Sequence, residues 1–200
     1  MLHRILTPMV VATLALVALF AAAAFYVSPA KAGGWAGCYG GVGGNYAADV
    51  AGGVLGADGP GVSILAGCDM QAQKLVFGGW AEYGWDWRQF AGVDLDVKGW
   101  AAGARAGYIV VPGALAYGLV GWTQQDLSLS GVGSMDADGW LVGGGAEFDL
   151  GSGFFGRAEY RYTRLDLDIA DDNVQSGRLA LIYKFDFLGN NAPAFGTPLK

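Results

Sequence analysis

The sequence predicts an all-β fold, an eight-stranded antiparallel up-and-down transmembrane β-barrel preceded by a helical signal peptide. Three observations predict it. An apolar run near the N-terminus ends in a small-residue cleavage pattern, which indicates export through the general secretory route. Eight later segments have the length of a barrel strand and alternate apolar with polar residues. The connections between these segments alternate long with short, as is typical of barrels in a bacterial outer membrane.

The first element is the signal peptide, which we expect over residues 1–32. A weakly basic start at Arg4 precedes an apolar run over residues 10–27. The small residues after this run predict cleavage between Ala32 and Gly33. Because the apolar run is long for a signal peptide, an uncleaved membrane anchor is the alternative.

Composition restricts the class of the mature protein. Charged residues make up only 15% of the chain, whereas the outside of a soluble sheet protein usually carries more charge. No long apolar run occurs after the signal, so we expect no helical membrane spans there. A net charge of −6 without a basic patch argues against a nucleic-acid partner. We expect one barrel domain over residues 33–185 and a disordered periplasmic tail over residues 186–200.

Each predicted strand is long enough to cross an outer membrane, which takes about 9–11 residues. The strands are expected over residues 35–46, 61–71, 74–86, 98–109, 114–125, 139–150, 153–165 and 175–185. Long polar connections, expected outside the cell, cover residues 47–60, 87–97, 126–138 and 166–174. Short periplasmic turns cover residues 72–73, 110–113 and 151–152. The even number of strands predicts that both ends of the barrel lie on the periplasmic side.

Alternation assigns two faces to every strand. In the seventh strand, Ala158, Tyr160 and Tyr162 share one face, and the charged side chains share the other. A soluble, lipocalin-like barrel would turn the apolar face inward. Aromatic residues near the strand ends instead fit the interfacial girdles of a membrane barrel, so we expect the apolar face to meet lipid. These aromatic residues are Trp35, Tyr46, Trp85, Trp100, Tyr108, Trp122, Trp140, Tyr162, Tyr183 and Phe185.

Several motifs occur in order along residues 35–185. They include Gly37-Cys38-Tyr39-Gly40-Gly41, Gly103-Ala104-Arg105-Ala106-Gly107-Tyr108, Gly143-Gly144-Gly145-Ala146-Glu147-Phe148, Arg157-Ala158-Glu159-Tyr160-Arg161-Tyr162 and the closing Tyr183-Lys184-Phe185. With them the chain resembles the small, porin-like outer-membrane β-barrel family common in alphaproteobacteria, whose barrel is like the OmpA transmembrane domain. The resemblance implies an outer-membrane location and surface-exposed loops, but no known reaction. It also implies that Tyr183 and Phe185 form the signal read by the barrel-insertion machinery, although family barrels usually end at that aromatic residue and this chain continues.

Two cysteines, Cys38 and Cys68, come after the predicted signal. If the first hairpin turns near residue 53, they lie opposite each other on neighbouring strands, where Cβ atoms are about 4.5–5.5 Å apart. Export to an oxidising compartment favours a structural disulfide that fixes the glycine-rich first strand. Two free thiols are the alternative.

Charged residues on the polar faces are expected to point into the lumen. They are Glu82, Arg105, Glu147, Arg157, Glu159, Arg161 and Arg178. Simple hairpin registers place Glu82 opposite Arg105 and Glu147 opposite Arg157. Because an eight-stranded barrel is just wide enough for side chains to fill, we expect an ion-pair network that plugs the barrel rather than a gate for small solutes.

The long connections carry acidic residues and almost no basic ones. The acidic residues are Asp49, Asp58, Asp94, Asp96, Asp136, Asp138, Asp168, Asp171 and Asp172. We expect solvated loop charge; a weak divalent-cation site that bridges to lipopolysaccharide phosphates is the alternative. The spacing matches no complete EF-hand loop, and the single histidine, His3, lies in the predicted signal. The sequence therefore predicts no metal site, no cofactor and no enzyme activity.

These observations predict a monomeric outer-membrane β-barrel with a structural, surface-exposed role in the envelope. Its expected partners are outer-membrane lipid and lipopolysaccharide, and the barrel-insertion machinery during assembly. The alternatives are a narrow porin for small solutes and a binding or adhesion module that acts through its loops.

Overall fold

The computed structural model describes residues 34–49, 57–90, 93–129, 133–166 and 171–185. The strands are β1 (Gly37–Asp49), β2 (Asp58–Ala72), β3 (Leu75–Phe90), β4 (Val93–Val111), β5 (Ala114–Leu129), β6 (Gly133–Gly151), β7 (Phe154–Asp166) and β8 (Asp171–Phe185). The predicted signal peptide, its cleavage site at Ala32 and Gly33, and the predicted tail over residues 186–200 lie outside the described residues. In the described part, no helix is long and apolar enough to cross a membrane.

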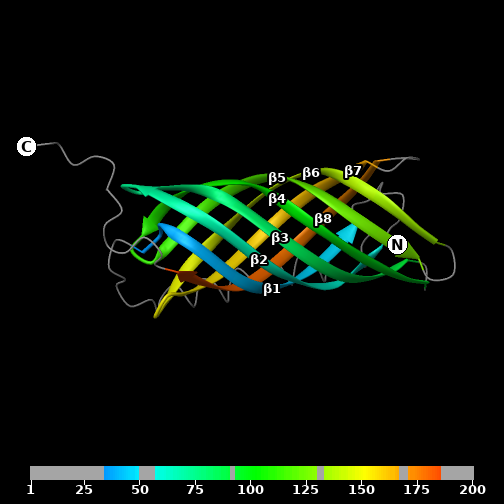
Figure 1. The fold of residues 1–200 in the computed structure, drawn as a ribbon, viewed down its shortest axis with the longest axis horizontal. Coiled ribbons are helices and arrows are strands. Elements are labelled where there is room, and N and C mark those ends of the chain that lie inside the picture. The colour runs from blue at the N-terminus through cyan, green and yellow to red at the C-terminus, as the bar shows by residue number, and fades with distance from the viewer. Residues whose placement is uncertain (1–33, 50–56, 91–92, 130–132, 167–170, 186–200) are drawn as a thin grey trace, which may run out of the picture.

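The strands form a closed antiparallel barrel in which each strand pairs with its sequence neighbours and β1 pairs with β8 (Figure 1). β1 begins and β8 ends at the same end of the barrel, where short turns join β2 to β3, β4 to β5 and β6 to β7. We call this the turn end and the opposite end the loop end. Ser152 and Gly153 form one of these turns with φ values of 55° and 83°, as a type I′ hairpin turn requires. The predicted fold class is confirmed.

Alternation along the strands separates the lumen from the outer surface. Along the middle of the strands the outward side chains are apolar and open to the surroundings, with 54% of Ile64, 56% of Val120 and 49% of Tyr160 exposed, whereas inward Glu147 is fully buried. The predicted inside and outside faces are therefore confirmed. An apolar surface that surrounds the whole barrel is far larger than the patches that soluble monomers expose, and it suits contact with lipid.

The strands extend further toward the loop end than the sequence predicted. β4 begins at Val93, inside the long connection expected over residues 87–97, and β6 begins at Gly133, inside the connection expected over residues 126–138. In this part of β4, Asp94 is exposed and points outward, whereas inward side chains such as Leu95 are buried. Near the loop end the alternation is therefore inverted, with polar side chains outside and apolar ones inside, as expected where the outer face of a strand meets water and not lipid. Where the structure describes these two predicted connections, they are polar on one face only and belong to strands.

Most predicted girdle aromatics occupy outward positions, but Trp35 does not. Trp35 is only 4% exposed and packs inside the turn end, where its ring centroid lies 5.2 Å from that of Phe155. It precedes β1, so strand alternation gives no information about its direction. The outward aromatics are Tyr46, Trp85, Trp100, Tyr108, Trp122, Trp140, Tyr162, Tyr183 and Phe185.

The interior contains two separate apolar clusters. The cluster nearer the turn end surrounds charged side chains and comprises Trp35, Tyr39, Val76, Trp80, Ala101, Leu115, Tyr117, Leu119, Leu141, Phe155 and Ile182. The loop-end cluster comprises Ala47, Ala57, Leu95, Val97, Leu127, Ala137, Leu165 and Val174. Gly145 shows how tightly the lumen is filled, since a Cβ atom there would lie 2.8 Å from the hydroxyl of Tyr117 and 2.3 Å from the carbonyl oxygen of Ala158.

Candidate functional site

Charged side chains inside the barrel form a connected network from the turn end to the middle of the lumen. Every lumen residue predicted from the sequence takes part, and two further residues, Asp69 and Lys184, join them. Because the strands alternate, each of these side chains comes from an inward position next to an outward apolar or small residue. The network is Asp69, Glu82, Arg105, Glu147, Arg157, Glu159, Arg161, Arg178 and Lys184.

Glu147 lies at the centre of the turn-end half of this network. Its Oε2 accepts hydrogen bonds from Arg105 at 2.8 Å and from the Nε and a terminal nitrogen of Arg157 at 3.1 and 2.9 Å. The Nζ of Lys184 lies 2.9 Å from the Oε1 of Glu147 and 3.5 Å from a carboxylate oxygen of Asp69. Arg105 also donates to Asp69 through its Nε at 2.9 Å. Three cations thus share two carboxylates in this buried half of the network, and the third negative charge near them is that of Glu159, whose carboxylate oxygen lies 3.9 Å from Arg157.

The second half of the network crosses the middle of the lumen. Glu82 of β3 accepts hydrogen bonds from Arg161 of β7 at 2.7 Å and from Arg178 of β8 at 2.6 Å. Arg161 also donates to Glu159 at 2.8 Å, and the hydroxyl of Tyr117 donates to the other oxygen of Glu159 at 2.8 Å. These contacts tie β3 to β7 and β8 across the lumen, and they tie β5 to β7.

One predicted register within the network is confirmed and one is wrong. Glu147 pairs with Arg157 across β6 and β7, as expected. Glu82 does not face Arg105: Glu82 pairs with Ala101, and Arg105 pairs with Gly78. The position and length of a hairpin connection set its register. Phe90 pairs with Val93, so the hairpin turns two residues earlier in the sequence than predicted. As a result, the residue that faces Glu82 is Ala101, four residues before the predicted Arg105.

Aromatic rings surround the buried guanidinium groups. Arg105 and Arg157 lie between Tyr39 and Tyr117, with distances from guanidinium carbon to ring centroid of 5.0 and 5.0 Å for Arg105 and 4.7 and 5.8 Å for Arg157. Such cation–π contacts stabilise a desolvated cation by about 2 kcal/mol. Sequence reasoning missed both tyrosines, Asp69 and Lys184 as parts of the site, although alternation along β1, β2, β5 and β8 places them inward.

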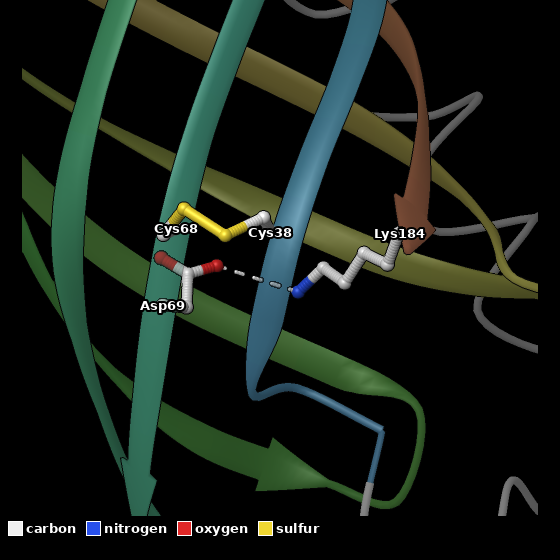
Figure 2. The surroundings of a disulfide bond; sticks show 4 residues. All are labelled: Cys38, Cys68, Asp69 and Lys184. Carbon is white, nitrogen blue, oxygen red and sulfur yellow. Dashed lines mark hydrogen bonds and ion pairs between the residues drawn. A yellow bond between two sulfur atoms is a disulfide. The ribbon is translucent and has the colours of Figure 1, made fainter. Parts of the chain in front are cut away.

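Cys38 and Cys68 form a disulfide between β1 and β2, near the turn end. The predicted register is confirmed, since the two residues pair directly and their Cα atoms are 3.9 Å apart. Both cysteines occupy outward positions, whereas Asp69, the residue after Cys68, points inward to Lys184 of β8 (Figure 2). The disulfide and the ion pair therefore restrain β1 and its neighbours on opposite surfaces of the barrel wall.

Most acidic residues predicted in the loops lie on strands instead. Asp58, Asp94, Asp96, Asp136 and Asp138 occupy exposed outward positions near the loop end. The exposure of these five side chains agrees with the solvation that the sequence predicts for them. The predicted loop setting is wrong because these residues belong to β2, β4 and β6, whose outward face near the loop end is polar.

The other predicted loop acids behave differently. Asp172 is an inward residue of β8 and is buried, so it is not a solvated loop charge. Asp49 and Asp171 are strand residues, and Asp168 lies outside the described residues. Within the described ranges, no group of three or more His, Cys, Asp or Glu residues could hold a metal ion.

Comparisons with known proteins agree with this geometry. Residues 12–185 match the family model described as outer membrane protein beta-barrel domain. The 25 kDa outer-membrane immunogenic protein of Brucella canis is 30% identical over 171 residues, which cover 77% of this chain and 79% of the relative. The protein of the same description from Brucella ovis is 30% identical over 162 residues, which cover 77% of this chain and 78% of the relative.

Solved structures share the fold. Neisserial surface protein A covers 74% of this chain and 97% of its own, with 20% identity and a TM-score of 0.58. The attachment invasion locus protein Ail of Yersinia pestis, in complex with the heparin analogue sucrose octasulfate, covers 75% and 97% with 18% identity and a TM-score of 0.51. At these identities the likeness concerns the barrel architecture alone.

Proposed function

This chain belongs to the outer membrane protein β-barrel domain family and is an outer-membrane protein, and we propose that it serves as a structural, surface-exposed component of the envelope whose barrel does not conduct. The observation that carries the proposal is the filled lumen. Glu147, Arg105 and Arg157 lie inside with at most 4% of each side chain exposed, and the ion pair of Glu82 with Arg161 crosses the lumen from β3 to β7. An eight-stranded barrel is just wide enough for such side chains to fill.

The same contacts argue against catalysis. The buried carboxylates Glu82, Glu147 and Glu159 each pair with at least two cations, so each is held by its partners rather than placed to exchange a proton with a substrate. The single histidine of the sequence, His3, precedes the described residues. We propose a barrel without enzymatic activity.

The outer surface suggests the proposed partners. The apolar band and its aromatic rims suit outer-membrane lipid and lipopolysaccharide. Tyr183 and Phe185, which point outward at the end of β8 with about two fifths of each side chain exposed, suit recognition by the barrel-insertion machinery. We propose that the protein acts as a monomer.

Planar-bilayer recording tests the central claim. We expect the refolded full chain to leave the bilayer current at its baseline. Stable, reproducible unitary conductance would overturn the proposal and favour a narrow porin. A heat-modifiability gel on outer membranes with and without the gene checks that a folded barrel is present. The structural role has its own test: loss of the gene is expected to increase the sensitivity of the envelope to detergent.

The second candidate is a binding role at the loop end. Ail, which shares the fold, binds the polyanion sucrose octasulfate in its crystal structure. In this chain the outward surface near the loop end carries Asp94, Asp96, Asp136 and Asp138, so charge repulsion disfavours a polyanionic ligand. We expect no binding of sucrose octasulfate to vesicles that contain the protein at physiological salt, and saturable binding would revive this candidate.

A further inference from the structure

The disulfide between Cys38 and Cys68 lies on the outer surface of the barrel wall. Both residues occupy outward positions, one on β1 and one on β2, and Cys68 is exposed. The next residue, Asp69, points away from the sulfur atoms to Lys184 inside the barrel (Figure 2). The bond is therefore open to whatever surrounds the barrel and separated from the lumen by the wall.

The outer surface around this bond is apolar. Cys38 pairs with Phe185 of β8, which is 42% exposed. Nearer the turn end than Cys68, the outward residues Met70 of β2 and Phe77 of β3 are 57% and 41% exposed. Because the apolar surface continues past the disulfide toward the turn end, the bond lies within the lipid-facing band of this outer-membrane protein.

We propose that lipid shields this disulfide and that the bond must form before the barrel enters the membrane. Thiol–disulfide exchange starts with the attack of a thiolate on a sulfur atom, so its rate depends on the access of an anion to that atom. An anion is costly to move into hydrocarbon. Once the wall is embedded, water-soluble thiols and disulfides can therefore neither open the bond nor close it. The unfolded chain, in contrast, presents both sulfur atoms to water.

The reaction that precedes insertion is a thiol oxidation in the periplasm, which is an oxidising compartment. The thiols of Cys38 and Cys68 give up two protons and two electrons to the disulfide of a soluble oxidant. A bond forms between the two sulfur atoms, and the oxidant leaves as a dithiol. The partner that this chemistry requires is a water-soluble disulfide oxidant that acts on the chain before the barrel is embedded.

Early closure of the bond also suits the composition of β1, in which five of the 13 residues are glycine. A glycine-rich strand specifies its register weakly, and a slip by one residue turns every side chain to the other face. The disulfide joins two directly paired residues, Cys38 and Cys68. It therefore holds the register of β1 against β2 while the other strands assemble.

Reduction by two phosphines tests the shielding, because phosphines attack disulfides without a thiolate. Tris(2-carboxyethyl)phosphine is charged, whereas tributylphosphine is neutral and dissolves in lipid. A matched control variant moves the bond along the same two strands. It combines Cys38→Ser and Cys68→Ser with Ala48→Cys and Asp58→Cys, which are outward, directly paired positions near the loop end. The heat-modifiability gel confirms that the variant folds.

The protein is placed in bilayer nanodiscs, so that both ends of the barrel meet the solution, and alkylation followed by mass measurement counts the thiols released. We expect the charged phosphine to reduce the native bond at least about tenfold more slowly than the control bond. The neutral phosphine should reduce the two bonds at rates within about threefold of each other, because it carries no charge into the lipid.

Two results of this comparison would overturn the proposal. Equal rates with the charged phosphine would show that the native bond lies in water. Slow reduction of the native bond by both phosphines would show that protein packing protects it and that lipid does not.

Pulse labelling in cells tests the order of events. Free thiols are blocked at intervals, and the heat-modifiability gel separates folded from unfolded molecules. We expect folded molecules to carry the disulfide from the earliest time at which they are detected. Folded molecules that first appear with free thiols and acquire the bond later would refute the proposed order. Neither measurement records ion flow, so the disulfide and the non-conducting barrel are judged separately.

Discussion

Replacing Glu147 by glutamine removes one negative charge from the centre of the lumen and keeps the shape of the side chain. The loss does not fall equally on its partners. Arg105 retains its hydrogen bond to Asp69, and Lys184 retains Asp69 at 3.5 Å. Arg157 retains only Glu159, whose oxygen lies 3.9 Å away. Arg157 therefore becomes a buried cation whose remaining ion-pair partner lies 3.9 Å away and accepts no hydrogen bond from it at that distance.

The structure sets the expected magnitude. Removal of one partner from a buried ion pair costs about 3–5 kcal/mol, because the charge that remains is desolvated and uncompensated. The Glu147 side chain is fully buried and that of Arg157 is 4% exposed, so this range applies without a discount for solvent. If the cost arises at Arg157, the double variant Glu147→Gln with Arg157→Met should lose about 0.5–3 kcal/mol less than the sum of the two single variants.

Denaturant titration of the protein in lipid vesicles measures these values, with the heat-modifiable gel shift as the signal for the folded barrel. Asp136→Asn is the matched control, because Asp136 is an exposed carboxylate on the same strand and its loss should change stability by no more than about 0.5 kcal/mol. A cost below about 1 kcal/mol for Glu147→Gln, or strict additivity in the double variant, would refute the reasoning that this carboxylate holds Arg157 in the lumen.

Three further changes test other parts of the molecule in the same titration. Cys38→Ser should cost about 3–4 kcal/mol, since the disulfide closes a loop with a sequence separation of 30 residues, and reductant should lower the stability of the unaltered protein but not of the variant. Ala158→Arg places a charge on the lipid-facing surface and should cost about 2–4 kcal/mol, whereas Ser128→Arg near the loop end should stay within about 0.5 kcal/mol; equal losses would contradict the assigned membrane position. Gly41→Ala should cost about 1–3 kcal/mol because its Cβ would lie 2.4 Å from a backbone oxygen of β8, whereas Gly44→Ala, with 3.8 Å available, should be nearly neutral.

Much of the barrel could be predicted from the sequence because its main signal is local. A side-chain period of two assigns inside and outside within each strand without knowledge of its neighbours. This is why the outward direction of Tyr160 and the inward direction of Glu147 were predicted correctly. Adjacent-strand contacts were also accessible where the turn was well placed, as the Cys38–Cys68 and Glu147–Arg157 pairs show.

The strand ends near the loop end were harder to predict because one rule does not hold along a whole strand. In the membrane, β4 turns Ala102 outward and Arg105 inward, and nearer the loop end it turns Asp94 outward and Leu95 inward. The period stays the same, but the solvent outside changes from hydrocarbon to water. A composition that is polar on average then resembles a loop, although the strand continues.

By itself the sequence determined the number of strands, the two faces of the wall and the facing positions of Cys38 and Cys68. Only the tertiary structure decided which charges meet inside. Glu82 binds Arg161 and Arg178, which are 79 and 96 residues away, and Lys184 reaches Asp69 across 115 residues. The physical reason is that a local period fixes the direction of a side chain, whereas the partner across the lumen depends on the register of every hairpin and on the closure of β1 against β8.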